Sequence, residues 1–477
     1  MDKILEVEMV FSSLSFLCVF LPVTLLLERL MPTTRTKNAV LVVASLLFYA
    51  YGEPTLVLLM VFSTLFNYAF GRLVGGSDGT ARKAWLAVAV VVNLGMLGVF
   101  KYAGMLVSTV NALLGLSLPV PDIPLPLGIS FYTFQALSYV IDVYRGDVEP
   151  QRNYTRILLY VSFFPQLIAG PIVKYHDIDE EMANRHAGME EAAMGLRRFS
   201  FGLAKKVLVA NVMASTADTL LALSPAEFAA PSAWLAAFAY LMQIYFDFSG
   251  YSDMAIGLGL CFGFHFKENF DHPYSSTSVK EFWRRWHMSL STWLKEYLYI
   301  PLGGNRKGRG RAMLNRIIVF FVCGLWHGAN WTFVVWGLLH GLMLLVEDVV
   351  DVRRLPRALG HVLTMLFVML TFVIFRCDTL QQGVGVIGTM FGGWRMDAAS
   401  MIPFFEQLTP LFIVTAIAAV ALAGSAPVRV RAWLDGRDAG QSLVAARASY
   451  AIAFLLLAIC MISLSSGTYN PFIYFRF

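Results

Sequence analysis

The chain has 477 residues, of which 57% are hydrophobic and only 14% are charged. Soluble globular proteins carry about 25% charged residues, so this composition, with a mean hydropathy of +0.62, excludes a soluble multi-domain enzyme. The aromatic content of 14% also excludes a disordered or fibrous chain. The sequence therefore predicts an all-α polytopic membrane protein.

The N-terminal residues and the cysteines disfavour a cleavable signal peptide, a disulfide framework and a metal site. The first nine residues hold three acidic residues and one lysine, unlike the basic start of a cleavable signal peptide, so we expect the first apolar segment to remain as a span. The five cysteines form neither a C-x-x-C pair nor a Cys/His cluster with zinc spacing. We therefore expect no disulfide framework and no metal site.

Apolar runs follow one another along the whole chain. The expected spans lie near residues 9–31, 38–52, 55–74, 84–107, 124–144, 155–175, 197–221, 231–264, 314–346, 359–376, 404–424 and 450–466. Several runs are too short to cross a bilayer core of about 30 Å, so we expect re-entrant or interfacial helices beside about eleven transmembrane helices. We treat residues 1–477 as one integral-membrane domain, and the absence of an internal repeat disfavours an inverted-repeat transporter.

One segment, residues 278–316, is strongly basic. Between residues 280 and 316 the sequence has nine basic residues, among them Arg306 and Lys307, against two acidic ones. The resulting local charge of +7 exceeds the net charge of +5 of the whole chain. Because basic loops tend to remain in the cytoplasm, the segment is expected on the cytoplasmic side of the membrane.

The first part of this segment has the pattern of an amphipathic helix. Ser278 and Glu281 have the spacing of a capping box at its start, and Pro301 marks its end. Its apolar face is expected to carry Trp283, Trp286, His287, Leu290, Trp293, Leu294, Tyr297 and Leu298. A basic helix with tryptophans on its apolar face is typical of an interfacial anchor, and on this pattern alone an anchor is the favoured interpretation.

Ionisable and amide side chains also occur inside an apolar run. The thirty residues between Arg316 and Glu347 include no Asp, Glu, Lys or Arg, but they include His327, Asn330 and His340. A polar group within a membrane span is costly and indicates a functional site, although a neutral histidine bonded to a neighbouring helix is the alternative. The two histidines are thirteen residues apart, which is a rotation of about 220° on an ideal helix, so they cannot share a site without a break.

His327 is the better candidate of the two because small residues surround it in the sequence. Imidazole has an unperturbed pKa of about 6.5 and is mostly neutral at pH 7, which suits a general base for a hydroxyl group that attacks a carbonyl. Cys323, one turn earlier, leaves a covalent Cys–His mechanism open, although a buried structural thiol is commoner.

Other polar and small residues are expected to be structural. The pairs Gly324/Gly328 and Gly337/Gly341 are small-xxx-small patterns that favour close helix packing. Asp247 and Asp253 are expected to bind backbone or hydroxyl groups in a broken helix, since six residues separate them. No nucleotide-binding loop, zincin motif or G-x-S-x-G elbow is present, and no nucleic-acid partner is expected.

Several motifs also carry a family resemblance. They are FWRRWHMSLSTW at 282–293, YLYIPLGGNR at 297–306 and GLWHGANW at 324–331, with PLGISFYTF at 126–134, IAGPI at 168–172 and YNPFIYFRF at 469–477. Together they resemble the membrane-bound O-acyltransferase superfamily, in particular its alginate O-acetyltransferase branch, over nearly the whole chain.

The resemblance implies a fold and a set of site residues. The implied fold is a ring of transmembrane helices around a central tunnel, and the implied donor is an acyl thioester, usually acetyl-coenzyme A, which is a substrate rather than a bound cofactor. By the same resemblance His327 matches the catalytic histidine and His287 a second, less strictly required one. The residues expected to bind substrate are Trp283, Trp286, Asn330, Trp331, Arg306 and Lys307.

The sequence thus leads to one main functional hypothesis. We expect an O-acetyltransferase of the bacterial inner membrane that moves acetyl groups from cytoplasmic acetyl-coenzyme A across the bilayer, for O-acetylation of an extracytoplasmic polysaccharide such as alginate. The expected partners are the lipid bilayer and a periplasmic acetyltransferase or accessory protein of a polysaccharide modification complex. The alternatives are a D-alanyl or other acyl transferase fed by an acyl carrier protein, and a polysaccharide or lipid transporter in which His327 relays protons.

Overall fold

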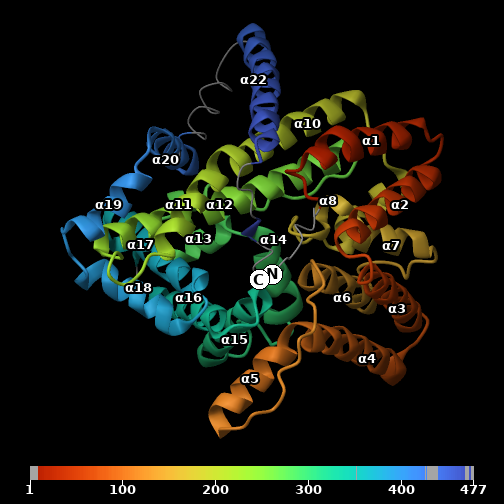
Figure 1. Ribbon diagram of the computed structural model, residues 1–477. Helices are drawn as coiled ribbons and strands as arrows, with labels where there is room; N and C mark the ends of the chain where they lie inside the picture. Colours follow the sequence, from red (N-terminus) through yellow and green to blue (C-terminus); the bar gives the residue numbers. More distant parts are fainter. Residues whose placement is uncertain (1–8, 351, 425, 427–438, 468–471, 474–477) are drawn as a thin grey trace. The chain divides into compact units, whose positions relative to one another are not determined.

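The computed structural model describes residues 9–350, 352–424, 426, 439–467 and 472–473, and within these residues it contains helices and turns but no β-strand (Figure 1). The predicted all-α class is therefore confirmed. The chain forms two compact units, of which the first comprises Met1–Phe199 with Ser252–Lys267 and the second Ser200–Tyr251 with Glu268–Phe477. Two of the three boundaries fall within helices, and the expectation of one acyltransferase domain stays a prediction.

The first unit contains the helices of the N-terminal part of the chain. They are η1 (Phe16–Phe20), α1 (Leu21–Leu30), α2 (Thr34–Gly52), α3 (Val57–Gly75), α4 (Gly79–Leu97), η2 (Gly98–Tyr102), α5 (Ala103–Leu114), α6 (Ile129–Arg145), α7 (Tyr154–Ser162), α8 (Phe164–Leu167), α9 (Tyr175–Asn184) and most of α10 (Met189–Ala204). Helix α3 packs on α4 and α6, and α2 packs on α7. Asp142 of α6, a possible partner of Arg145 by sequence spacing, lies 2.9 Å from His176 Nδ1 of α9.

The second unit contains the elements that carry both candidate histidines. They are η3 (Lys205–Ala210), α11 (Asn211–Leu221), most of α12 (Ala230–Cys261), η4 (Pro273–Ser275), α13 (Val279–Arg285), α14 (Met288–Leu294), η5 (Lys295–Tyr299), α15 (Arg309–His327), α16 (Trp331–Val349), η6 (Val352–Arg354), α17 (Arg357–Arg376), α18 (Leu380–Gly392), α19 (Ala398–Gln407), α20 (Pro410–Ala423) and α22 (Ala439–Ser465). Helix α16 packs between α15 and α17 and also contacts α13. One hydrophobic cluster of this unit joins α12, α17 and α18 through Ala233, Val373 and Met390.

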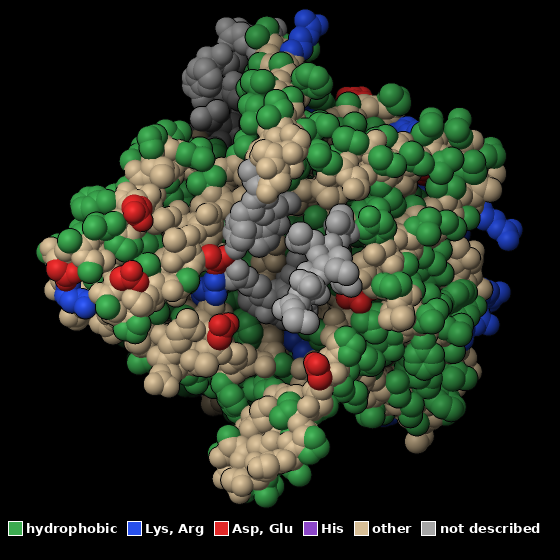
Figure 2. Space-filling model, in the orientation of Figure 1, with side chains coloured by type: hydrophobic (Ala, Val, Ile, Leu, Met, Phe, Trp, Pro, Cys, Tyr) green, Lys and Arg blue, Asp and Glu red, His purple; other side chains and the backbone are tan. Residues whose placement is uncertain are grey.

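Five of the described helical segments are long and apolar enough to cross a membrane, namely Val57–Gly75, Gly79–Leu114, Trp331–Val349, Arg357–Arg376 and Leu443–Ser465. The pair α19–α20, bent by 66°, makes a sixth if it is counted as one broken span. Figure 2 shows hydrophobic side chains over much of the visible face and few charged ones, as a lipid environment requires. The predicted multi-pass membrane class is confirmed, and the count of about eleven crossings stays a prediction.

Three expected elements differ from the structure. The expected broken helix around Asp247 is instead the continuous 32-residue helix α12. The expected amphipathic helix between Ser278 and Pro301 is divided into α13, α14 and η5, because tertiary hydrogen bonds replace helical ones at its centre. The apolar run 314–346 is divided into α15 and α16, which pack on each other as a hairpin.

Candidate functional site

The two candidate histidines lie next to each other in the second unit. His327 is the last residue of α15, and His287 is the residue between α13 and α14. The centroids of their imidazole rings are 6.3 Å apart. Both side chains are buried, with 6% of His327 and none of His287 exposed. Two motifs that are separate in the sequence therefore form one site.

The end of α15 places His327 at this site. Gly328 has an extended backbone with a φ of −166°, which stops the helix directly after His327. Asn330 then begins α16, since its side chain accepts a hydrogen bond from Thr332 N and donates one to Asp378 O. His327 and His340 therefore lie on two different helices, α15 and α16, and not on one continuous helix.

Two glycines allow α15 and α16 to approach each other closely. A Cβ atom on Gly324 would lie 2.4 Å from Phe333 O, and one on Gly337 would lie 2.3 Å from Phe320 O and 3.1 Å from Gly324 Cα. Any side chain at either position would therefore meet the backbone of the other helix. The predicted role of these glycines in helix packing is confirmed.

His287 has an unusual backbone conformation that aims its ring at the site. Its φ is +45°, in the left-handed region that residues other than glycine rarely adopt. The backbone oxygen of Asn269 accepts a hydrogen bond from Met288 N, and Asp271 N donates to Arg285 O, so the preceding segment holds the break between α13 and α14. Such strain occurs where the surrounding structure enforces it, often at functional sites.

The side chain of Asn269 determines the tautomer of His287. Its Oδ1 atom accepts hydrogen bonds from Ser289 N and Ser289 Oγ and lies 3.2 Å from His287 Nδ1. Because the backbone N–H of Ser289 can only donate, the amide oxygen faces His287, whose Nδ1 therefore carries the proton. Nε2 then has the lone pair, and no described residue forms a hydrogen bond with it. Burial, reinforced by the adjacent His327, lowers the pKa of His287 and keeps it neutral.

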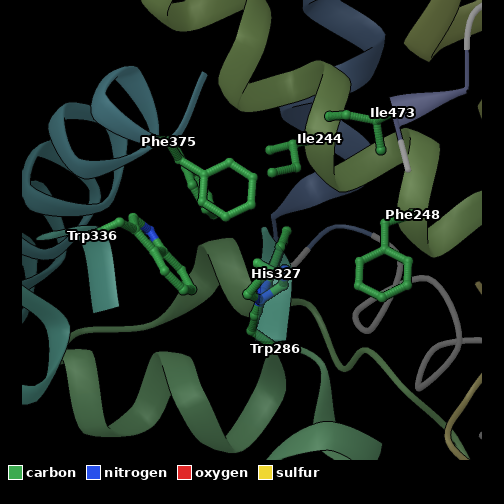
Figure 3. A pocket seen from close by; sticks show the side chains of 8 residues that line it. Ile244, Phe248, Trp286, His327, Trp336, Phe375 and Ile473 are labelled. Atoms are coloured by element: carbon green, nitrogen blue, oxygen red, sulfur yellow. The ribbon is translucent and has the colours of Figure 1, made fainter. Parts of the chain in front are cut away.

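A small apolar pocket adjoins His327, and all of its lining residues belong to the second unit. It has about 290 Å³ of space free of atoms, part of which is open to solvent, and is lined by Ile244, Phe248, Trp286, His327, Trp336, Phe372, Phe375 and Ile473. Figure 3 shows Trp336 and Phe375 on one side of His327 and Phe248 and Ile473 on the other. The rings of Trp336 and Phe375 meet the imidazole edge-on, at centroid distances of 5.1 and 5.2 Å. His327 is thus the ionisable group in an otherwise apolar lining.

His340 has a structural arrangement instead. The indole Nε1–H of Trp283 donates to its Nδ1 at 3.1 Å, so the ring proton is on Nε2, which lies 3.1 Å from Thr371 Oγ1. Both ring nitrogens are therefore used in joining α13, α16 and α17. The alternative of a neutral histidine bonded to neighbouring helices describes His340, whereas His327 lines the pocket.

The residues expected to bind substrate occupy different places. Trp286 lines the pocket, Trp283 binds His340, and Asn330 caps α16. Trp331 is 48% exposed and is not part of the pocket lining. Trp283 of α13 and Trp286, which follows this helix, are buried against other aromatic side chains. The interfacial-anchor interpretation of this segment stays a prediction.

The basic segment separates into paired and exposed side chains. Lys280 and Arg316 both pair with Asp348, and Arg285 pairs with Glu281 and Asp271. Four further basic residues are exposed between η5 and the first turn of α15, and no ion pair involving them is found in the described part of the chain; they are Arg306, Lys307, Arg309 and Arg311. We call these four the basic loop.

Sequence reasoning missed Asn269 and six of the eight residues that line the pocket, among them Trp336 and Phe375. Asn269 lies in a segment between helices and belongs to no recognisable motif, so no local signal indicated its bond with His287. Trp336 and Phe375 have the appearance of ordinary apolar helix residues in the sequence, although both line the pocket. Cys323, the alternative nucleophile, is buried and is not part of the pocket lining.

Comparisons with known proteins identify the family of this chain. A model of the membrane-bound O-acyltransferase family matches residues 151–377, which include both histidines. The probable alginate O-acetylase AlgI of Azotobacter vinelandii is 41% identical over 98% of this chain and 100% of its own length. Its counterpart from Pseudomonas aeruginosa is 45% identical over 82% of this chain and 76% of its own length. The peptidoglycan O-acetyltransferase of Helicobacter pylori is 36% identical over 80% of each chain. This chain therefore belongs to the membrane-bound O-acyltransferase family and is a multi-pass membrane O-acyltransferase.

Proposed function

We propose that this protein is an O-acetyltransferase that uses acetyl-coenzyme A as donor and an extracytoplasmic polysaccharide such as alginate as the final acceptor. The observation that carries the proposal is the position of His327 and His287, with ring centroids 6.3 Å apart, beside an apolar pocket. The names of the relatives, alginate O-acetylase and peptidoglycan O-acetyltransferase, support acetyl as the acyl group.

In the proposed reaction His327 acts as general base. An acceptor hydroxyl group gives its proton to the imidazole of His327 while its oxygen attacks the thioester carbonyl of the donor. An ester C–O bond forms, the C–S bond breaks, and the proton passes from the imidazolium to the sulfur of coenzyme A. The apolar surroundings favour this reaction because they exclude water, which would otherwise hydrolyse the thioester.

His287 is proposed to position the acceptor for this step. Its Nε2 lone pair is fixed by the bond from Nδ1 to Asn269, so it can accept a hydrogen bond. Because the attacking hydroxyl group gives its only proton to His327, the bond to His287 comes from a second hydroxyl group of the acceptor, and it holds the attacking oxygen close to the thioester. We assign Trp286, which lines the pocket, to contact with the acyl group.

The basic loop is proposed to bind the phosphate groups of the donor. Arg306 and Lys307 are exposed, whereas Lys280 and Arg316 share an ion pair with Asp348, so the exposed charge that an anionic ligand can reach is greatest in this loop. Acetyl-coenzyme A is cytoplasmic, and the loop would then face the cytoplasm from the bacterial inner membrane. A separate periplasmic acetyltransferase or accessory protein is proposed to complete the transfer to the polysaccharide.

The family assignment removes the transporter from consideration, because members are acyltransferases. Transfer of D-alanine from an acyl carrier protein is distinguished by the donor used in the test below.

The test compares His327→Ala with the wild type in membrane vesicles that contain the native partners, using acetyl-coenzyme A labelled in the acetyl group. The variant is expected to lower kcat by about 10²- to 10⁴-fold, the usual contribution of a positioned base, with little change in the donor KM. Cys323→Ser is the matched control from the same helix and should keep most of the activity. Near-normal turnover of His327→Ala, or an inactive Cys323→Ser, contradicts the general-base mechanism. A wild type that accepts only a carrier-bound D-alanyl group contradicts the acetyl donor.

A further inference from the structure

A buried ion pair in the second unit lies outside the chemistry proposed above. Asp247 of α12 and Lys206 of η3 are both buried, and Lys206 Nζ is 2.6 Å from Asp247 Oδ1. Removing two charges from water is costly, and the attraction between them repays this cost only when further hydrogen bonds satisfy the remaining polar atoms. The second carboxylate oxygen of Asp247 binds a backbone N–H group, as expected from the sequence.

The second carboxylate oxygen of Asp247 binds the backbone of Ile473. Asp247 Oδ2 accepts a hydrogen bond of 2.9 Å from the backbone N–H of Ile473. The adjacent Phe472 ring lies 4.9 Å from the ring of Tyr251 and 5.7 Å from Lys206 Nζ. One hydrogen bond and two ring contacts thus fix residues 472 and 473 on α12 and η3.

Ile473 is in turn part of the pocket beside His327. Its side chain is 2% exposed and lines the pocket together with Ile244 and Phe248, facing the side that Trp336 and Phe375 form (Figure 3). The aromatic rings of that side come from α16 and α17, which pack on each other. On the opposite side, the pocket is closed in part by Ile473, whose backbone is held by a hydrogen bond to Asp247.

We propose that Ile473 determines acyl-chain specificity by closing the pocket to chains longer than acetyl, and that Asp247, with Lys206, is the positioning residue that holds it there. The inference rests on the proposed function, because it takes the pocket to receive the acyl group of the donor. Because the backbone N–H of Ile473 is bonded to a buried carboxylate, the backbone that carries this side chain cannot move away from the pocket without breaking that bond. Rigidity is what lets a pocket reject one extra methylene group.

The size of the effect follows from the volume at stake. Ile→Ala removes three carbon atoms from the wall, which makes room for the one or two additional methylene groups of propionyl or butyryl. One methylene group in a hydrophobic pocket changes discrimination by about 10- to 200-fold. We therefore expect Ile473→Ala to raise the ratio of butyryl to acetyl transfer, measured as kcat/KM, by about 10-fold or more.

The experiment measures transfer from acetyl-, propionyl- and butyryl-coenzyme A in the vesicle assay described above. Ile473→Val, which loses a single carbon, should shift the preference less than Ile473→Ala. The matched control is Ile462→Ala in α22, where the isoleucine is 71% exposed and does not line the pocket, and its chain preference should equal that of the wild type. An Ile473→Ala protein that transfers acetyl with the wild-type chain preference overturns the inference.

A second pair of variants tests the positioning role of Asp247. Asp247→Ala removes the acceptor for Ile473 N and should relax the chain preference in the same direction as Ile473→Ala. Asp247→Asn keeps an oxygen for that N–H and should restore much of the selectivity, which a purely structural role would not predict. If Asp247→Ala does not fold, the Ile473 variants decide the matter alone. A wild type that transfers no acetyl group contradicts the proposed function itself, whereas normal acetyl transfer with an unchanged ratio contradicts only this inference.

Discussion

At the scale of single residues, the chemistry of His287 depends on a side chain outside every motif. Asn269 accepts a hydrogen bond from Nδ1 of His287, so the lone pair is on Nε2, which has no hydrogen-bond partner among the described residues. Burial lowers the pKa of His287, which keeps the ring neutral at physiological pH. A residue that fixes a tautomer in this way can be as important for activity as the histidine itself, and it can be tested separately.

Asn269→Asp provides this test. Aspartate keeps the oxygen that accepts from Ser289 and from His287, but its negative charge favours the imidazolium and should raise the pKa of His287. Activity that needs the Nε2 lone pair falls as pH drops below this pKa, so the acidic limb of the kcat profile should move to higher pH. The variant should therefore be most impaired near pH 6 and recover towards pH 9, as measured by acetyl transfer across this range.

The control for this prediction is Asn269→Leu, which has a similar volume but no acceptor. It should lower kcat at every pH without displacing the acidic limb, because the tautomer is no longer fixed and no charge is added. An unchanged pH profile in Asn269→Asp, together with normal activity, indicates that His287 does not act as an acceptor in catalysis.

The candidate residues could be predicted from the sequence to different degrees. His327 is identifiable because a polar side chain in a long uncharged run is costly in a membrane and is rarely kept without a function. Asn269 is not, since its role depends on a contact with a residue in another segment. The spacing of His327 and His340 correctly predicts that they do not share a site. In the structure, however, a helix break follows His327, and His340 is bonded to Trp283 and Thr371.

At the scale of elements, the hairpin of α15 and α16 determines where His327 lies. The two helices approach closely at Gly324 and Gly337, and the turn between them contains the capping residue Asn330. Small residues at a helix contact permit such an approach in a membrane, where burial of apolar surface contributes little to association. The hairpin should therefore be sensitive to one added methyl group.

Gly337→Ala tests this sensitivity. Its Cβ would lie 2.3 Å from Phe320 O, a backbone atom that can move only if the helices separate. We expect a destabilisation of about 1–3 kcal/mol, the usual cost of overpacking, and a loss of acetyl transfer as His327 shifts. Thermal unfolding in detergent measures the first effect.

Gly388→Ala in α18 is the matched control for the hairpin. It is also a helical Gly→Ala change, but nothing lies within 4 Å of its Cβ position. Alanine is favoured over glycine in a helix by about 0.5–1 kcal/mol, so this variant should be as stable as the wild type or more so. Equal stability of the Gly337 and Gly388 variants contradicts the close contact between α15 and α16.

The elements were predictable where composition decides them and not where contacts do. The all-α class and the apolar helices follow from hydropathy alone. The division of the segment after Ser278 into α13 and α14 does not, because Met288 N donates to Asn269 O and Asp271 N donates to Arg285 O, and these bonds outweigh the regular helical spacing. The broken helix expected at Asp247 is also wrong, because α12 continues through this residue. The charge of Asp247 is paired with Lys206, a contact between separate elements that the sequence does not reveal.

At the scale of the whole molecule, charge is unevenly distributed along a mostly apolar chain. The local excess of +7 in residues 280–316 exceeds the net charge of +5, so the remaining residues are on balance acidic. In this basic segment, no side chain of the basic loop forms an ion pair among the described residues, whereas Lys280, Arg285 and Arg316 each do. The loop is therefore the place where an anionic donor would gain most from this charge.

Neutralising the loop tests its role in donor binding. The triple variant Arg306→Gln, Lys307→Gln, Arg309→Gln should raise the KM for acetyl-coenzyme A with little change in kcat. The KM of the wild type should rise with salt, since exposed charges are screened over about 8–10 Å, and that of the triple variant should rise less. The double variant Lys280→Gln, Arg316→Gln is the control, because those side chains pair with Asp348. Equal donor KM values for the triple variant and the wild type reduce the loop to a topology signal.

The same loop gives a direct test of orientation in the membrane. Gly310 lies in the first turn of α15, is exposed, and has nothing within 4 Å of a Cβ position, so a cysteine is accommodated there without strain. Of the five native cysteines only Cys18 is exposed, and Cys18→Ser removes it from the background. In this background a membrane-impermeant maleimide should label Gly310→Cys in inside-out vesicles and not in intact spheroplasts, because a basic excess of this kind favours the cytoplasmic side. Full labelling after detergent solubilisation shows that the cysteine is reactive. Labelling in intact spheroplasts contradicts the predicted orientation and, with it, the proposal that the donor binds from the cytoplasm.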